Sequence, residues 1–354
     1  MKIYQTIYHT LKQEIADRLY TKGDLLPSEI ELAQRFSTSR PTVAKALEML
    51  RDEKLIDRKA GFGTTVLRSE LTHGEKIGLL IPQLGRAEIF EPICSAIQEE
   101  AHKHYWQIIL PSEPRGNNDI KKATELLCTT FIREKCDGVF YTPPNRIEDP
   151  EPFNLKILAR LKKAGIAVVL LDREILRWPH QTPCDLVGVD NILAGLLVTE
   201  HLRKQGCEKL VFAKHENSTG MIDLRIIGAR EAIHQAGLPP ETLSIVKLNA
   251  KQEINPIIQQ MPDGLICAND EMAADLMRKL LDAGVNIPGT LRVAGFDDVK
   301  YAALLSVPLT TYRQPCAEIG RAAVTTMLQR LNLPDSAPIR VTLQGELITR
   351  FSTN

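Results

Sequence analysis

The sequence predicts an α/β protein in two parts: a small helical head with a two-stranded wing, and a large two-lobed body built on parallel sheets. Two observations predict this. Apolar residues in the first 68 positions recur at helical spacing and precede two short strands that flank a glycine-rich turn. After residue 76, nearly continuous apolar runs alternate with helical patterns, which is typical of parallel sheets covered on both faces. The 354 residues suffice for two or three domains.

The head opens with a predicted helix over residues 3–20, which Gly23 ends. Ser28 and Glu31 have the spacing of a capping box and predict that a second helix covers Glu29–Arg35. The third helix carries Pro41 in its first turn, where proline is tolerated. Its predicted core face consists of Val43, Ala46, Leu47 and Leu50. The expected apolar face of the first helix consists of Ile3, Ile7, Leu11, Ile15 and Leu19.

Two short helices, a tight turn and a wing are typical of proteins that place one helix in a DNA groove. The wing strands are expected at residues 55–58 and 64–67, with Gly61 and Gly63 in the turn. The outer face of the third helix then offers Ser39, Arg40, Thr42 and Lys45 to DNA, with Arg35 close by. Each residue also has a plainer interpretation. The arginines and Lys45 could be solvated surface charges, Ser39 and Thr42 could only cap the helix, and the two glycines could only form the turn.

Composition sets broad limits. The net charge is zero, but the first 68 residues hold twelve Lys and Arg against nine Asp and Glu, a mild basic excess in the head. The seven cysteines are scattered without short pairs, which favours reduced, buried thiols in the cytosol. No apolar run has membrane-spanning length, and no leader pattern stands at the N-terminus, so a cytoplasmic protein without membrane contact is expected.

The head is expected to cover residues 1–68, a polar linker residues 69–75, and the body residues 76–354. Nine strand-like runs predict two α/β lobes. They fall at residues 76–81, 107–110, 138–141, 166–171, 186–189, 210–213, 243–248, 264–268 and 291–296. Helices between them are expected at residues 91–104, 192–205, 224–236 and 271–283, among others.

Polar residues directly follow four of these runs: Gln83, Asp172, Asn269 and Asp297. Ligands of open α/β sheets bind outside the carboxyl ends of the strands, so these groups predict a site for a small polar molecule. Arg225 is available as a forked donor for hydroxyls, and Phe90 as a stacking surface. The alternative is that the acids and the asparagine only cap the helices that follow their strands.

Catalytic and metal-binding patterns are poorly represented. His102 and His104 are two residues apart, so on a helix they point away from each other and cannot chelate one metal. The sequence has neither a nucleophile elbow nor a phosphate-binding P-loop. We therefore expect no enzyme activity, no metal and no cofactor.

Leu26–Val66 resembles the GntR family of winged-helix repressors through Leu26-Pro-Ser-Glu29, Ser39-Arg-Pro-Thr-Val43 and Gly61-Phe-Gly-Thr64. Residues 76–351 resemble the sugar-responsive core of LacI/GalR-type repressors, which is similar to periplasmic binding proteins. The phrases that carry this second resemblance include Lys76-Ile-Gly-Leu-Leu-Ile-Pro82, Val169-Leu-Leu-Asp-Arg173, Val187-Gly-Val-Asp-Asn191, Cys267-Ala-Asn-Asp270 and Val293-Ala-Gly-Phe-Asp-Asp298. The pairing is like that of arabinose-responsive repressors.

The first resemblance implies DNA contacts at Ser39, Arg40 and Thr42 and in the wing from Gly61 to Thr64. Ile30 and Ala44 stand where that family often has arginine, so the base preference is not carried over. The second implies effector contacts at a set of four polar positions and an apolar wall. These positions are Asp172, Arg225, Asn269 and Asp297, with Ile89 and Phe90 in the wall.

Together these features predict a homodimeric repressor that binds a near-palindromic operator in double-stranded DNA and responds to a small sugar or sugar derivative. Three alternatives stay open. The body could bind a nucleoside or another polar metabolite, or the chain could be a sugar-active enzyme on a Rossmann-like scaffold. A solute-binding protein of a transporter would have a secretory leader where this chain has a DNA-binding head.

Overall fold

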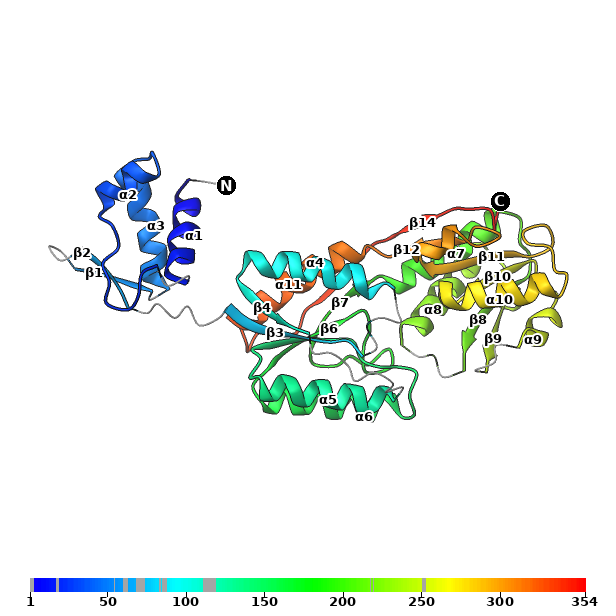
Figure 1. Cartoon of the computed structure of the whole chain (residues 1–354). Helices are drawn as coiled ribbons and strands as arrows, with labels where there is room; N and C mark the ends of the chain where they lie inside the picture. The colour runs from blue at the N-terminus through cyan, green and yellow to red at the C-terminus, as the bar shows by residue number, and fades with distance from the viewer. Residues whose placement is uncertain are drawn as a thin grey trace. The chain divides into compact units, whose positions relative to one another are not determined.

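The computed structural model describes residues 3–16, 19–53, 55–59, 63–67, 74–82, 84, 88–110, 119–216, 218, 220–249 and 253–354. The chain forms two compact units, Met1–Glu75 and Lys76–Asn354. Of the predicted linker, residues 69–73 lie outside the described part. The two units are described separately below (Figure 1).

The head unit packs three helices against a two-stranded antiparallel wing. The elements are α1 (Ile3–Ala16), α2 (Glu29–Arg35), α3 (Arg40–Asp52), β1 (Ile56–Lys59) and β2 (Gly63–Val66). Their apolar faces form one core of their own. This core lets the head exist as a separate folding unit.

The capping box predicted at the start of α2 is confirmed. The Ser28 hydroxyl accepts the Glu31 backbone N–H at 3.3 Å, and the Glu31 carboxylate accepts the Ser28 N–H at 2.7 Å. These two bonds satisfy backbone donors that the first helical turn leaves free, so α2 begins at the predicted residue, Glu29. The helix also ends at Arg35, as predicted. The four predicted core residues of α3 are also fully buried.

The first helix is shorter than predicted. It ends at Ala16. Leu19, beyond that end, is 66 % exposed, and Ile3 at the start of the helix is 54 % exposed. A spacing of four residues turns 400° on a helix, so each step drifts about 40° from the previous side chain. The middle of the series, Ile7 to Ile15, stays on the core face, and its two ends do not.

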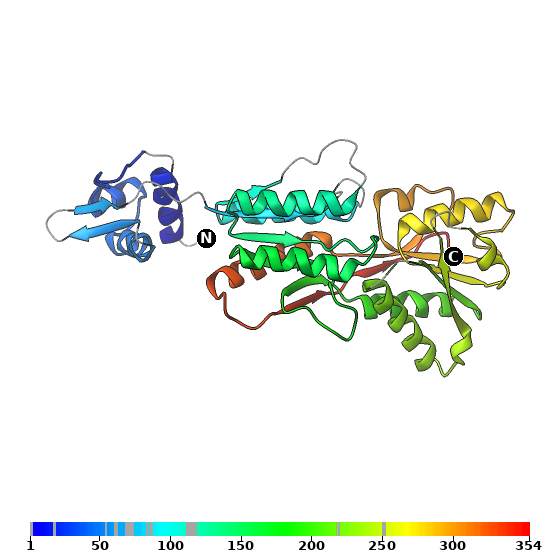
Figure 2. The same ribbon diagram turned by 90° about the horizontal axis from the view of Figure 1, so that it is seen from below.

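The body contains two six-stranded sheets, one in each lobe (Figures 1 and 2). The first has the order β13-β7-β6-β5-β3-β4 and the second β14-β12-β11-β10-β8-β9. The first-lobe strands are β3 (Gly74–Leu80), β4 (Trp106–Ile109), β5 (Gly138–Tyr141), β6 (Ala167–Leu171), β7 (Asp185–Val189) and β13 (Arg340–Leu343). The second-lobe strands are β8 (Leu210–His215), β9 (Leu243–Leu248), β10 (Gly264–Cys267), β11 (Arg292–Asp297), β12 (Thr310–Arg313) and β14 (Glu346–Ile348).

Helices cover both faces of the first sheet, as the continuous apolar strands predict. On β5, Phe140 points into the core beneath α4 and α11, while Val139 and Tyr141 point into the core beneath α5 and α6. The first-lobe helices are α4 (Phe90–Lys103), α5 (Ile120–Arg133), α6 (Pro150–Lys163) and α11 (Cys316–Asn332). The second-lobe helices are α7 (Asn191–Lys204), α8 (Met221–Gln235), α9 (Asn255–Ile258) and α10 (Asp270–Asp282).

The chain passes between the lobes three times: from β7 to α7, from β12 to α11, and from β13 to β14. Two of these passages are bonded to each other, because the Asp190 N–H donates to the Leu343 carbonyl at 3.0 Å. The Gly345 N–H also donates to the Tyr312 hydroxyl at 2.7 Å. The crossings thus form one connected hinge.

The nine predicted strands of the body are all present within about two residues, whereas β12, β13 and β14 were not predicted. Inner strands run parallel, and β14 is antiparallel to β12. The seven cysteines carry no disulfide, and six are buried. Among the described residues, no helix is both long and apolar enough to cross a bilayer.

Candidate functional site

The N-terminal end of α3 carries the residues predicted to meet DNA. Ser39 and Arg40 are exposed and Thr42 is half-buried. Ser39 is the N-cap residue, but its hydroxyl makes no capping bond and instead lies 2.8 Å from the Thr42 hydroxyl. The expected capping role of the Ser39 side chain is therefore wrong, and this hydroxyl pair remains at the surface.

Glu29, the first residue of α2, links the start of α3 to the wing. Its carboxylate lies 3.8 Å from the Arg40 guanidinium and also binds Arg58 on β1. The Arg40 side chain remains 64 % exposed, so the ion pair orients the guanidinium without removing it from solvent. Arg58 was not among the predicted DNA residues, because its strand position alone does not distinguish it from a solvated charge.

Two other predicted DNA residues make contacts within the head. The Arg35 guanidinium donates to the Glu14 carboxylate of α1 at 3.0 Å, and this bond raises the pKa of Arg35. The Lys45 ammonium lies 4.4 Å from the centre of the Tyr4 ring, a cation–π distance. Arg35 is thus tied to α1, whereas Lys45 rests on a ring at an exposed position.

The two described wing residues that were predicted to meet DNA, Gly63 and Thr64, differ in what their positions allow. Gly63 has φ +91°, a left-handed conformation that favours glycine over residues with a Cβ atom. The Thr64 side chain is only 8 % exposed, and its carbonyl accepts the Leu26 N–H at 2.9 Å. This position fits a packing role better than a side-chain contact to DNA. Gly61 lies outside the described residues.

In the body, a cavity of about 580 Å³ lies between the carboxyl ends of strands from both lobes. It brings together five of the predicted effector residues: Ile89 and Phe90 from the start of α4, Arg225 from α8, Asn269 from the start of α10, and Asp297 from the end of β11. Its other polar and aromatic lining residues include Glu88, Thr142, Asn145, Arg146, Arg173, Ser218, Glu271 and Tyr301. Gln83 lies outside the described residues.

Arg225 is the most strongly held of these residues, with a side chain only 1 % exposed. Its Nε donates to Asn191 at 2.9 Å, and one terminal nitrogen donates to the Ala268 carbonyl at 2.7 Å. The other terminal nitrogen lies 3.7 Å from the Asp297 carboxylate, and the guanidinium lies 4.4 Å from the centre of the Phe296 ring. The fork is therefore preorganised at the cavity wall.

The position of α8 explains how Arg225 reaches the cavity. A Cβ atom on Gly195 of α7 would lie 1.9 Å from the Arg225 carbonyl oxygen, so only glycine allows the two helices to pack this closely. Asn191, which receives the Arg225 bond, stands at the start of the same helix α7. The glycine and the asparagine thus fix the backbone and the side chain of Arg225.

Asp297 has φ +114°, a strained conformation for a residue with a side chain. Its carboxylate accepts the Gln314 amide at 2.7 Å. Burial raises the pKa of Asp297 to about 6, and the Arg225 charge opposes this rise. A strained, buried and partly compensated carboxylate at a cavity wall is typical of a functional position.

Asp172 stands just behind the cavity wall. It has φ +69° and is 4 % exposed, and one carboxylate oxygen lies 2.7 Å from the Arg173 guanidinium. Its other oxygen is buried without a hydrogen-bond partner, as is the Thr142 hydroxyl at the end of the neighbouring strand β5. Unsatisfied buried polar atoms are uncommon and mark places where a ligand can supply the missing bond.

Asn269 caps α10, because its side-chain oxygen accepts the Met272 N–H at 3.0 Å. The plainer interpretation of this residue is therefore confirmed, although it also lines the cavity. Sequence reasoning did not assign Thr142, Arg173 or Tyr301 to the site, although all three line the cavity. Thr142 follows strand β5 directly, and Arg173 follows strand β6 after Asp172, which is the signal that could have identified them.

No cluster of three or more potential metal ligands occurs within the described ranges. The polar groups of the cavity are arginines, carboxylates, amides and hydroxyls. Such groups bind hydroxyl-rich ligands by hydrogen bonds.

Comparisons with known proteins find a match in the head and another in the body. Residues 3–66 match the bacterial regulatory proteins of the gntR family, and residues 199–353 match the periplasmic binding protein-like domain. The arabinose metabolism transcriptional repressor of Geobacillus stearothermophilus is 27 % identical over 98 % of this chain and 97 % of its own length. The repressor of the same name from Halalkalibacterium halodurans is 26 % identical over 99 % and 97 %.

Solved structures resemble the body. A LacI family transcriptional regulator from Enterococcus faecalis V583 with bound ribose has a TM-score of 0.64 and 25 % identity, covering 78 % of this chain and 98 % of that one. The complex of the transcriptional regulator CelR with cellobiose has a TM-score of 0.66 at 19 % identity, covering 92 % and 100 %. The chain therefore consists of a GntR-type helix-turn-helix domain followed by a periplasmic-binding-protein-like domain.

Proposed function

We propose that the protein is a transcriptional repressor whose affinity for operator DNA is controlled by a small, uncharged sugar bound in the cavity of the body. The observation that carries this proposal is that Arg225, Asp297 and Thr142 line one cavity where elements of both lobes meet, with Asp172 ion-paired to the lining residue Arg173. Forked donors beside carboxylate acceptors are suited to vicinal hydroxyls, and the apolar wall at Phe90 is suited to a sugar face.

The charges of the cavity favour a neutral ligand. Three arginines contribute to its lining, and each is paired with a carboxylate: Arg146 with Glu271 at 3.3 Å, Arg173 with Asp172 at 2.7 Å, and Arg225 with Asp297 at 3.7 Å. A phosphate or carboxylate on the ligand would have to compete with these internal partners. We therefore infer an unphosphorylated sugar and not a sugar phosphate or a sugar acid.

We further propose that the protein acts as a cytoplasmic homodimer. Each head would contact one half of a near-palindromic operator through Arg40, Ser39, Thr42, Lys45 and Gly63, because a two-fold dimer presents two equivalent recognition helices. Sugar binding would favour one arrangement of the lobes and release the DNA. A ligand does this only through different affinities for the two arrangements.

The test combines ligand screening with DNA binding on the full-length protein. Thermal shift and calorimetry with arabinose, ribose and cellobiose should identify a neutral sugar that binds, while ribose 5-phosphate, gluconate and adenosine should not bind. The active sugar should weaken binding to the chain's own upstream region in an anisotropy assay. Binding of adenosine alone would favour a nucleoside-responsive regulator.

We also propose that the protein does not convert the bound sugar, since the three described carboxylates that line the cavity are already engaged: Glu88 by Lys300, Glu271 by Arg146 and Asp297 by Arg225. Product analysis by mass spectrometry after prolonged incubation decides this point. Conversion of the sugar would favour the enzyme alternative, and stoichiometric binding without product would support the regulator.

A further inference from the structure

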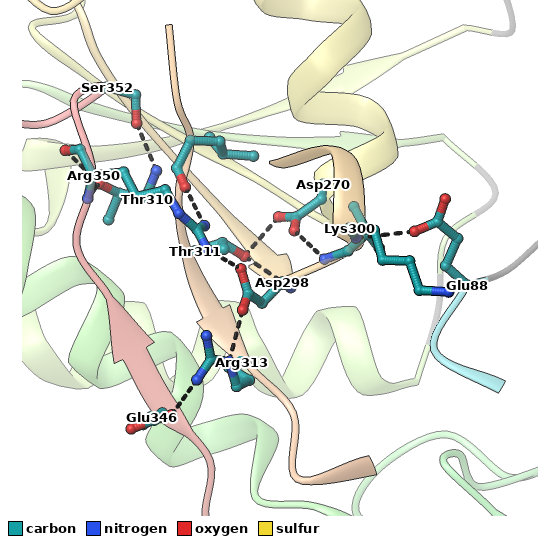
Figure 3. A network of polar contacts seen from close by, with 12 residues as sticks. Glu88, Asp270, Asp298, Lys300, Thr310, Thr311, Arg313, Glu346, Arg350 and Ser352 are labelled. Carbon is teal, nitrogen blue, oxygen red and sulfur yellow. Dashed lines mark hydrogen bonds and ion pairs between the residues drawn. The ribbon is translucent and has the colours of Figure 1, made fainter. Parts of the chain in front are cut away.

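A hydrogen bond from a backbone N–H to a carboxylate joins the two lobes at the rim of the cavity, as the Arg146–Glu271 ion pair does at 3.3 Å. The Lys300 N–H, in the second lobe, donates to the Glu88 carboxylate of the first lobe at 3.0 Å (Figure 3). The Lys300 ammonium also lies 3.2 Å from the carboxylate of Glu91, in the first turn of α4. Glu88 lines the cavity and directly precedes Ile89 and Phe90 of its apolar wall. The bond therefore connects ligand-facing segments of both lobes.

Lys300 belongs to a short segment, residues 297–300, that begins with Asp297. The fully buried residue Asp270 holds this segment through hydrogen bonds. The Asp270 carboxylate accepts the Val299 N–H at 3.2 Å and the Thr311 hydroxyl at 2.7 Å, and the Thr311 oxygen in turn accepts the Asp298 N–H at 3.3 Å. Consecutive backbone groups of the segment are thus fixed to β12 and α10 (Figure 3).

Asp298 adds a second anchor. Its carboxylate binds the Arg313 guanidinium at 2.7 Å and the Arg350 guanidinium at 2.6 Å, which joins the segment to β12 and to the C-terminal stretch (Figure 3). Asp297 and Asp298 both have positive φ angles, so this network holds the backbone in a strained form. These bonds fix the position of Lys300 relative to Asp297.

We propose that Glu88 is a positioning residue that holds the segment 297–300 against the opposite lobe and so sets how readily the cavity opens. The proposal rests on the proposed function, since the ligand is the sugar that contacts Asp297. A charged acceptor for a backbone N–H is stronger than a neutral one, and Glu88 makes such a bond. The Glu91–Lys300 pair is 72 % and 80 % exposed on its two side chains, and exposed pairs contribute little.

The difference between Glu88 and Glu91 gives a matched experiment on the full-length protein. Hydrogen exchange followed by mass spectrometry, without any sugar, reports the protection of the peptide covering residues 297–304. Glu88→Ala should increase exchange in this peptide by about tenfold at the affected amide, because a charge-assisted bond is lost. Glu88→Gln keeps an acceptor oxygen and should restore part of the protection. Glu91→Ala removes the same charge without touching the backbone bond and should match the wild type.

A second arm uses whichever of arabinose, ribose and cellobiose binds the wild type. Glu88→Ala should raise its dissociation rate about tenfold, and Glu91→Ala should leave the rate within about twofold. Equal exchange and equal dissociation in the two alanine variants would overturn the proposal. If none of the three sugars bound the wild type, the proposed function would fail, while the sugar-free exchange would still decide whether Glu88 holds the segment.

Discussion

Arg225 and Asp297 face each other across 3.7 Å at the wall of the cavity, with side chains 1 % and 13 % exposed. The distance is longer than a direct hydrogen bond, so the two groups form an ion pair without a hydrogen bond between them. The guanidinium is held by Asn191 and Ala268, and the carboxylate by Gln314. Each partner thus keeps hydrogen-bonding capacity for a ligand hydroxyl placed beside both.

The raised pKa of Asp297 means that its ionised carboxylate destabilises the sugar-free protein. Burial raises the pKa from 3.8 to about 6, so the folded state holds this proton more tightly than the unfolded chain does. The group therefore lowers the free energy of unfolding as the pH rises from about 4 to about 6. The full penalty, about 3 kcal/mol at most, is present above pH 6.

Asp297→Asn should thus stabilise the sugar-free protein at pH 8 by about 1–3 kcal/mol while abolishing sugar binding. Urea denaturation at pH 8 and pH 5 checks the first part, and the gap between variant and wild type should shrink by roughly half at pH 5. Asp282→Asn, at a position 73 % exposed, is the control and should change neither property. A variant less stable than the wild type at both pH values would contradict the raised pKa.

Arg40→Ala should weaken operator binding by about tenfold or more, because an arginine at the start of a recognition helix meets base edges or phosphates. Fluorescence anisotropy with the upstream region of the chain's own gene measures the effect. Arg51→Ala provides the control: it removes the same charge from the far end of α3, where Arg51 pairs with Glu48. Equal losses in the two variants would mean that only the net charge of the head matters.

Lys45→Ala should weaken binding to specific and random DNA alike and lower the slope of log affinity against log salt by about 0.9, the value for one phosphate contact. In the free protein the ammonium rests on the Tyr4 ring, from which it has to turn toward the DNA. Affinity measured at four salt concentrations gives the slope. An unchanged slope would assign Lys45 to packing on Tyr4.

Gly195→Ala should both destabilise the body and impair sugar binding. The new Cβ atom would lie 1.9 Å from the Arg225 carbonyl oxygen, which is backbone and has to shift as a whole helix. Overpacking of this kind costs about 1–3 kcal/mol or more. Thermal unfolding and calorimetry measure the two effects. Glu200→Ala, on the same helix, is the control and should change neither stability nor sugar binding. If Gly195→Ala bound the sugar as well as the wild type does, α7 would not position Arg225.

Local patterns predicted much of the fold. The capping box placed the start of α2, and the apolar runs placed nine strands, because each of these signals has a short-range physical cause. Strands β12 to β14 were missed because polar residues interrupt or replace the apolar run in each of them, and β13 and β14 at the sheet edges are half-buried or exposed. β13 pairs with β7, which lies 154 positions earlier in the sequence (Arg340 opposite Leu186), so no local pattern signals it.

The candidate site was predicted in part. Strand ends identified Asp297 and Asn269, which the structure places on one cavity, and the family resemblance added Ile89. Thr142 was missed because a threonine after a strand is common and only its unsatisfied buried hydroxyl marks it. The cross-lobe bond from Lys300 to Glu88 spans 212 positions in the sequence and has no local signal.

The three passages of the chain between the lobes mean that neither lobe is a continuous stretch of sequence. The last fifteen residues supply β13 to the first sheet and β14 to the second. Neither half is therefore complete until residues 340–348 have been synthesised. No single proteolytic cut or truncation can isolate one half intact, and loss of the tail would damage both at once.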